Sequence, residues 1–243
     1  MKVYLAGQGG FPWKKQNYYD FYRLDSYFDV KNKKTNHYKF KDFILDSGVF
    51  TYLTSKKDKK VDWDKYVYEY GSYVKKEGIE NYVEVDVDVK IGLKEVERLR
   101  KNLEKIVGYK SIPVWHLNRS YDKWLEICKD YDYICFGAFL TDGLKEEKFP
   151  YIKKFLSDAK KNKCRVHGLG MTSMKWLKQL PFYSVDSSSW TSGCRFGSYH
   201  KFNGRQIKSI SKPKSKRIID TYKLGEHNFN EWIKFQKYAD EYL

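Results

Sequence analysis

Four aspartates close or follow short apolar runs in this sequence, and groups of that kind can carry out nucleophilic or acid–base chemistry. Asp46 closes the run FILD, Asp86 and Asp88 alternate with valines in VEVDVDV, and Asp186 closes FYSVD. Carboxylates that converge on one site can divide into a nucleophile and a proton carrier, because their surroundings separate their pKa values. A single such aspartate is more often a helix cap or a turn residue, so the inference rests on the set.

Two histidines and three glycines extend this set. His116 lies near the end of SIPVWHL, Gly137 lies in YICFGAF, and His167 opens HGLG, which also supplies Gly168 and Gly170. Because glycine lets a backbone approach closely, HGLG could line a planar ligand or hold a phosphate. Gly-X-Gly is also common in ordinary turns, and a lone histidine is more often structural than catalytic.

A metal site is the less favoured interpretation of these residues. Asp86, Asp88 and His116 could bind a metal, but strand alternation places only the two aspartates on one face and leaves the histidine unassigned. The cysteines show no Cys-X-X-Cys spacing of the kind that builds a structural zinc site. They stand at positions 128, 135, 164 and 194. We therefore expect no metal, no cofactor and free thiols in a reducing cytoplasm.

Short runs rich in β-branched and aromatic residues predict the strands that would position these groups. They span residues 2–7, 43–48, 82–89, 111–117, 133–139, 164–170 and 182–186, with a possible eighth at 204–210. Alternation with helices predicts a parallel sheet, and eight strands fit a single (β/α)8 TIM barrel of near-minimal length over residues 1–243. A doubly wound open sheet is the alternative. In a barrel, the C-terminal strand ends would gather the polar residues at one mouth.

Helical spacing and capping residues mark the intervening helices. One apolar stripe runs from Trp63 to Val74, and another runs from Leu93 to Ile106 and stops before a glycine. Ser120 and Thr172 could cap two further helices, and Pro150 suits the first turn of another. We expect a C-terminal helix at about 228–243.

The charge balance favours a polyanionic partner. Lys and Arg outnumber Asp and Glu by 47 to 31, which gives a net charge of +16. Lysine-rich loops at 31–34, 56–60 and 211–217 could form a rim that binds a nucleic-acid backbone, although a merely solvated surface has the same composition. The residues proposed for that rim are Lys56, Lys57, Lys59, Lys60, Arg195, Lys212, Lys214, Lys216 and Arg217. No stretch approaches the ~18 apolar residues of a membrane span, so we expect no membrane partner and a cytoplasmic location.

Five motifs in order resemble the tRNA-guanine transglycosylase family. FILDSGVF is similar to its aspartate-serine-glycine motif, and VHGLGMTS followed by YSVDSSSWTSGCR is similar to its glycine-X-glycine and nucleophile strands. YVEVDVD, PVWHL and CFGAF fall where the family's other pocket strands belong. The resemblance covers roughly residues 40–197.

The resemblance implies a role for each candidate residue. Asp186 would attack the ribosyl C1′ and form a glycosyl ester, which suits a carboxylate because it stabilises oxocarbenium-like charge. Asp46 would bind the base and handle its proton. The remaining residues would bind the base. Phe50 and His167 stand where the family stacks it between an aromatic and a methionine, and Asp86 or Asp88 would contact the guanine edge. His116 takes the place of a glutamine, and Gly137, Gly168 and Gly170 would contact the base through the backbone.

The sequence departs from the family by lacking the cysteine cluster of its zinc subdomain. Short relatives of this layout, including viral ones, insert 7-deazaguanines into DNA, so the resemblance favours DNA over tRNA, and a free purine or 7-deazaguanine base as the second substrate. For a viral protein the location would be the host cytoplasm. The alternatives are exchange on tRNA, a nucleoside hydrolase or N-glycosidase, and a non-catalytic nucleic-acid-binding barrel. The sequence leaves the oligomeric state open.

Overall fold

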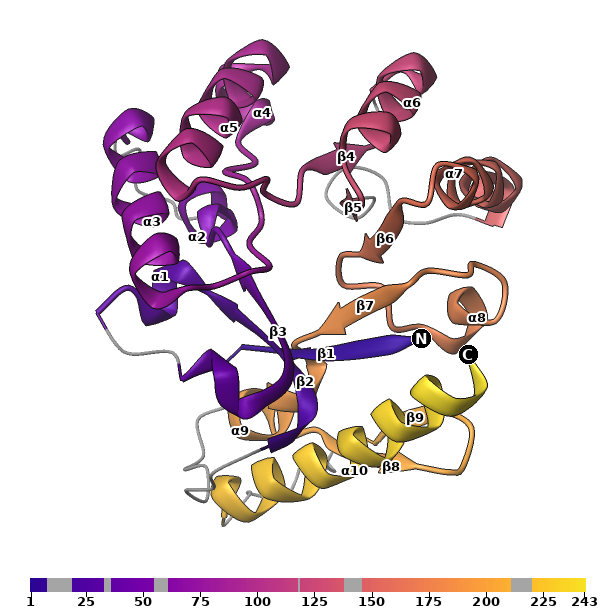
Figure 1. The fold of residues 1–243 in the computed structure, drawn as a ribbon. Coiled ribbons are helices and arrows are strands. Elements are labelled where there is room, and N and C mark those ends of the chain that lie inside the picture. The colour runs from indigo at the N-terminus through magenta and orange to yellow at the C-terminus, as the bar shows by residue number, and fades with distance from the viewer. Residues whose placement is uncertain (8–18, 33–35, 55–60, 118, 138–145, 211–219) are drawn as a thin grey trace.

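Seven parallel strands form one curled sheet with helices on its outer side (Figure 1). The computed structural model describes residues 1–7, 19–32, 36–54, 61–117, 119–137, 146–210 and 220–243. The strand order is β3-β2-β1-β7-β6-β5-β4. The strands are β1 (Lys2–Ala6), β2 (Tyr19–Ser26), β3 (Phe40–Asp46), β4 (Val114–His116), β5 (Tyr133–Gly137), β6 (Arg165–Gly168) and β7 (Ser184–Ser187).

The two edge strands, β3 and β4, are linked through residues 82 and 83. Tyr82 forms an isolated parallel bridge with Leu45 in β3, and Val83 forms one with Ile112 just before β4. The backbone N–H of Val83 donates to Leu45 at 2.9 Å, and that of Ile112 donates to Tyr82 at 2.8 Å. The predicted parallel α/β sheet is therefore confirmed, with single bridges rather than a full strand across this gap.

The predicted strand over 82–89 is wrong beyond its first two residues. Oε1 of Glu84 accepts the backbone N–H of Val114 at 2.6 Å, so a side chain takes the donor that a neighbouring strand would otherwise use. Asp88 then begins the short helix α4 (Asp88–Ile91). Asp86 and Asp88 consequently do not share one regular strand.

The predicted eighth strand lies outside the main sheet, and the sequence did not predict β2 at residues 19–26. Residues 204–210 contain β9 (Ile207–Ile210), which pairs antiparallel with β8 (Tyr199–Phe202) in a separate hairpin. β2 shows no alternation because most of its length is buried, including Arg23 and Asp25, whose side chains pair at 2.5 Å. A strand covered on both faces and carrying buried charges has neither of the usual strand patterns.

The stripes and caps predicted most of the helices. Those confirmed are α3 (Trp63–Glu77), α5 (Leu93–Val107), α6 (Tyr121–Asp130) and α7 (Phe149–Lys161). Ser120 Oγ caps α6 by accepting from Lys123 at 3.3 Å, whereas α8 (Met174–Leu177) begins after Ser173 rather than Thr172. α10 (Thr221–Tyr242) begins before the expected residue 228. The short helices are α1 (Tyr27–Val30), α2 (Val49–Thr54), α9 (Ser192–Phe196) and the 3₁₀ turns His37–Lys39, Glu146–Lys148 and Ser189–Thr191.

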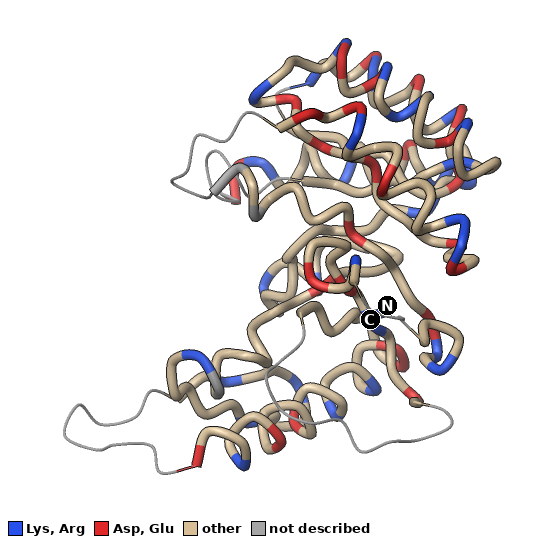
Figure 2. The backbone as a smooth tube through the Cα atoms, turned by 90° about the vertical axis from the view of Figure 1, so that its left-hand side faces the viewer, with Lys and Arg blue, Asp and Glu red and all other residues tan. Residues whose placement is uncertain are grey.

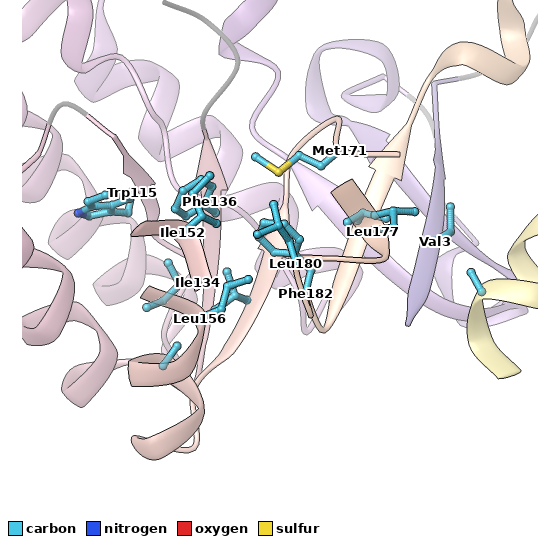
Figure 3. Packing of buried hydrophobic residues seen from close by; sticks show 14 of the residues in the cluster. Val3, Trp115, Ile134, Phe136, Ile152, Leu156, Met171, Leu177, Leu180 and Phe182 are labelled. Carbon is cyan, nitrogen blue, oxygen red and sulfur yellow. The ribbon is translucent and has the colours of Figure 1, made fainter. Parts of the chain in front are cut away.

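The main core lies between the sheet and its outer helices. Figure 3 shows Trp115 and Phe136 of the sheet beside Ile152 and Leu156 of α7. α10 covers the outer side of β1 and β2, where the Gln236 side chain donates to the Val3 carbonyl at 2.5 Å. A second cluster lines the inner face of the sheet and includes Tyr4, Tyr22, Ile44, Tyr133 and Cys135.

Charges of both signs are interspersed along the outer helices (Figure 2). Among the residues that the structure describes, no helix combines the length and apolar character needed to cross a bilayer. Cys128, Cys135 and Cys164 are free thiols.

We predict that Arg100→Met destabilises the protein by roughly 3 kcal/mol. Arg100 pairs with Glu84 at 3.1 Å, and these side chains are 7% and 0% exposed, so the substitution leaves an uncompensated buried charge. The matched control is Arg98→Met on the same helix, whose pairs with Asp64 and Glu95 are exposed to solvent and should contribute little to stability. Urea unfolding of both variants measures this. Equal losses would mean that the buried pair has no special role.

Candidate active site

The C-terminal strand ends bring most of the predicted site residues onto the inner face of the sheet. Asp46 ends β3, His116 ends β4 and pairs in register with Gly137 of β5, and Asp186 lies in β7 beside β1. The buried thiol of Cys135 lies close to this group: burial raises its pKa well above the ordinary value, and the charges of Asp46, Asp186, Glu84 and Asp86 raise it further. Four carboxylates therefore surround one end of the sheet.

Asp46 has the weakest compensation for its charge. Oδ2 accepts the backbone N–H of Gly48 at 2.8 Å. Burial raises the pKa of Asp46 to about 6, the Gly48 hydrogen bond opposes this, and the charges of Asp186 and Asp86 add to the increase. A carboxyl group with this pKa can take up and release a proton near neutral pH.

Gly48 is required by the turn that follows Asp46. Its φ is +77°, and a Cβ there would lie 2.5 Å from Ser26 Oγ and 2.8 Å from the Phe28 backbone nitrogen. Any side chain would be strained and would collide with backbone. The Asp-Ser-Gly sequence thus sets the position of the Asp46 carboxylate.

Asp186 is held through one carboxylate oxygen. Oδ1 accepts the backbone N–H of Gly170 at 2.7 Å and lies 3.2 Å from Nε2 of His167. Gly170 has a φ of +67°, a left-handed conformation that turns the HGLG loop back over β7. The side chain of Asp186 remains 14% exposed, so a substrate can reach it.

His167 does not present a free face for a base, as the resemblance implied. Its side chain is completely buried, Nδ1 lies 2.7 Å from Ser184 Oγ, and its ring packs edge-on against Tyr4 at 5.7 Å between centroids. Its ring contacts Ser184 of β7 and Tyr4 of β1.

Asp86 and Asp88 form an ion-pair cluster with His116 and Arg119. His116 Nε2 lies 2.6 Å from Asp86, and Nδ1 lies 2.8 Å from the Gly137 carbonyl. Since both neighbours only accept hydrogen bonds, both ring nitrogens donate and the imidazole is charged. Arg119 Nη2 donates to Asp88 at 2.8 Å and to Asp86 at 3.3 Å.

The same cluster contains the three residues that could bind a metal. Ligand atoms of Asp86, Asp88 and His116 lie within 4.8 Å of one another, which is close enough for a shared cation. However, Arg119 and the charged imidazole already balance the two carboxylates. A metal would have to displace the guanidinium and deprotonate His116, so these residues do not fit one well.

Gly137 makes room for His116. A Cβ at position 137 would lie 2.7 Å from Cε1 and 2.8 Å from Nδ1 of the imidazole. The close packing explains why a glycine ends β5.

Some predicted residues lie apart from this group. Phe50 is 52% exposed in α2, and Arg195 is exposed in α9, with its guanidinium 5.0 Å from the centre of the Phe196 ring. Gly168 packs against Met171 rather than contacting the carboxylates. The other predicted nucleic-acid-binding residues, Lys56, Lys57, Lys59, Lys60, Lys212, Lys214, Lys216 and Arg217, lie outside the described residues.

Sequence reasoning missed Arg119, Ser184, Tyr133 and Glu84. Glu84 shares the alternation of Asp86 and Asp88, which could have identified it. The other three offered no local signal.

A cleft of about 670 Å³ adjoins the ion-pair cluster of Asp86, Asp88, His116 and Arg119, and its lining includes Asp88, Arg119, Lys94 and Lys123.

No known family model matches this sequence, and no curated protein matches it. A protein from a structural study of Aquifex aeolicus VF5 is similar, with 16% identity and a TM-score of 0.40 over 62% of this chain and 55% of that chain. A mutant tryptophan synthase alpha-subunit from the hyperthermophile Pyrococcus furiosus is similar, with 12% identity and a TM-score of 0.42 over 79% and 66%. The chain spans less than two thirds of either protein's length, and these similarities carry no functional argument.

We predict that Asp86→Asn lowers the pKa of His116. Burial lowers this pKa, but the hydrogen bond and charge of Asp86 outweigh it and raise the pKa above its ordinary value. Without that charge, burial should dominate and bring the pKa below about 6.5. Ring-proton NMR titration measures it. Asp88→Asn, which removes a partner of Arg119 and not of His116, is the control and should cause a much smaller change.

We also predict that Asp46→Asn becomes more stable relative to wild type as pH rises from about 4 to about 7. The pKa of Asp46 is about 6 in the folded state, above its ordinary value of 3.8, so folded protein binds the proton more tightly and loses stability as pH rises through that window. The relative gain should be roughly 1–3 kcal/mol, since the side chain is partly exposed. Chemical unfolding across this range measures it. A difference independent of pH would contradict the raised pKa.

Proposed function

We propose that the protein is a guanine transglycosylase that exchanges guanine in a polynucleotide, with DNA favoured, for a 7-deazaguanine base. The observation that carries this proposal is the presence of two unlike carboxylates at strand ends, close enough that the charge of Asp186 raises the pKa of Asp46. Asp186 has one oxygen held by donors, and Asp46 has a pKa of about 6. A nucleophile and a proton carrier are the two groups that base exchange through a covalent intermediate requires.

In the first half-reaction, Asp186 attacks C1′ of the target nucleoside. The C1′–O bond forms as the C1′–N9 bond breaks, and the electron pair of the broken bond goes to N9 of guanine. Protonated Asp46 donates its proton to the departing base and becomes a carboxylate. The product is a glycosyl ester of Asp186 within the polynucleotide.

In the second half-reaction, the incoming base reverses these steps. Asp46 removes its proton, the base nitrogen attacks C1′, and the ester C1′–O bond breaks to restore the Asp186 carboxylate. Both active-site groups return to their starting protonation states. Arg119, the charged His116 and the paired Asp86 and Asp88 would contact the polar edge of the base.

We also propose that the sheet closes into a barrel. We take the bridged residues Tyr82 and Val83 as the eighth position of a (β/α)8 barrel, because they pair with both edge strands. The preference for DNA rests on the scattered spacing of the four cysteines in these 243 residues, which form no zinc-binding cluster, and on the net charge of +16. Arg195 is an exposed cation in α9, the helix that follows β7 in the sequence.

We predict that Asp186→Asn folds normally but loses base exchange by roughly three orders of magnitude or more, because an amide cannot act as the nucleophile. Incorporation of labelled guanine or a 7-deazaguanine into single-stranded DNA, duplex DNA and tRNA measures activity. Denaturing gels should reveal a covalent protein–DNA adduct only with wild type. Asp158→Asn is the matched control, because its side chain is similarly buried, at 12% exposure, but lies on α7 away from the site.

Other results of these assays would assign a different activity to this protein. Full activity of Asp186→Asn would reject the mechanism. Release of base without replacement would identify an N-glycosidase, and incorporation into tRNA alone would overturn the choice of DNA. Binding without either reaction would indicate a non-catalytic module.

A further inference from the structure

A line of buried hydrogen bonds runs along the inner face of the sheet and ends at Asp186. Tyr133 Oη of β5 lies 2.6 Å from Ser184 Oγ of β7, and Ser184 Oγ lies 2.7 Å from Nδ1 of His167 in β6. Nε2 of His167 lies 3.2 Å from Oδ1 of Asp186. Ser184 and His167 are completely buried, and Tyr133 is 5% exposed.

A neutral His167 ring gives this line one direction. An ionised Asp186 only accepts, so Nε2 of His167 carries the proton and Nδ1 of the neutral ring accepts from Ser184. The Ser184 oxygen then accepts from Tyr133. Burial raises the pKa of Tyr133 well above its ordinary value, so the phenol keeps its proton. The order of donation is Tyr133 to Ser184 to His167 to Asp186.

The geometry at the end of the line separates the two oxygens of Asp186. Oδ1 receives both His167 Nε2–H and the Gly170 backbone N–H, at 3.2 Å and 2.7 Å. Neither of these donors contacts Oδ2. Among the described residues, these two donors therefore hold one oxygen of the carboxylate and not the other.

We infer that His167 is a positioning residue, held in its Nε2–H tautomer by Ser184 and Tyr133 on one side and by Asp186 on the other, and that it fixes Oδ1 of Asp186 so that Oδ2 is the attacking atom. This inference rests on the proposed transglycosylase function and assigns His167 a role other than stacking on the base. An imidazole ring held by a partner on each side loses its freedom to flip, and a fixed tautomer is what such a partner provides.

The same arrangement serves both half-reactions. When Oδ2 bonds to C1′, Oδ1 becomes the carbonyl oxygen of the ester and keeps its two donors. When the ester C1′–Oδ2 bond breaks, its electron pair returns to the carboxylate, and the His167 and Gly170 donors stabilise the charge that develops.

The first test needs no substrate. In wild-type protein with ¹⁵N-labelled histidine, the ring spectrum of His167 should show protonated Nε2 and unprotonated Nδ1 near neutral pH. In Ser184→Ala the Nε2–H form should persist, because Asp186 still accepts from it, while the Nδ1 resonance should shift because that nitrogen loses its donor. Ser111→Ala is the matched control, because Ser111 is also buried and donates to an acid, Glu104 at 2.9 Å, but lies outside the site. A wild-type ring protonated at Nδ1 alone would overturn the inference, whatever reaction the protein catalyses.

The second test compares two replacements of His167 in base exchange on single-stranded DNA. His167→Gln keeps an N–H donor at similar reach, whereas His167→Leu removes it. The leucine variant and Ser184→Ala should each lose on the order of tenfold or more in kcat with KM little changed, and glutamine should recover part of that loss. Equal losses in both His167 variants together with unchanged kcat in Ser184→Ala would reject the positioning role. Absence of exchange in wild type would reject the proposed function instead, and the tautomer measurement would still decide the hydrogen-bond line.

Discussion

The site depends on how the negative charge gathered at one end of the sheet is compensated. Each carboxylate there has a different compensating partner. Glu84 has the buried guanidinium of Arg100, Asp86 shares His116 and Arg119, and Asp186 has an imidazole N–H and an amide. Within the described part of the chain, Asp46 accepts a hydrogen bond from the Gly48 amide. Burial nevertheless raises the pKa of two of these groups toward neutral pH, that of Glu84 to about 7 although Arg100 opposes the increase, and that of Asp46 to about 6.

The partners reach the site from elements that are distant in sequence. Arg100 comes from the outer helix α5, Arg119 follows β4, and Gly170 follows β6. The charges are therefore balanced between segments rather than within them. Such cross-connections tie the position of each carboxylate to the packing of the helices around the sheet, so the inner face depends on the outer layer.

Sequence reasoning could predict the features that depend on local pattern. The predicted strand ends brought Asp46, His116, Gly137 and Asp186 together, because parallel strands end at the same edge of a sheet. The fully buried β2 carried no periodic signal, and the eighth strand was assigned to residues that form a hairpin instead. The line from Tyr133 through Ser184 to His167 depends on the register of three strands, which no local pattern specifies.

The pairing of β1 with β7 governs when this site can form during synthesis. Tyr4 is in register with Asp186, so the first strand has to wait for most of the chain before it finds that neighbour. Its outer side waits longer still for α10, whose Gln236 bonds to Val3 across 233 positions. Contacts of such separation slow folding and leave apolar strands uncovered on the ribosome. The outer side of β1 in a nascent chain of this protein thus stays uncovered until α10 has been synthesised.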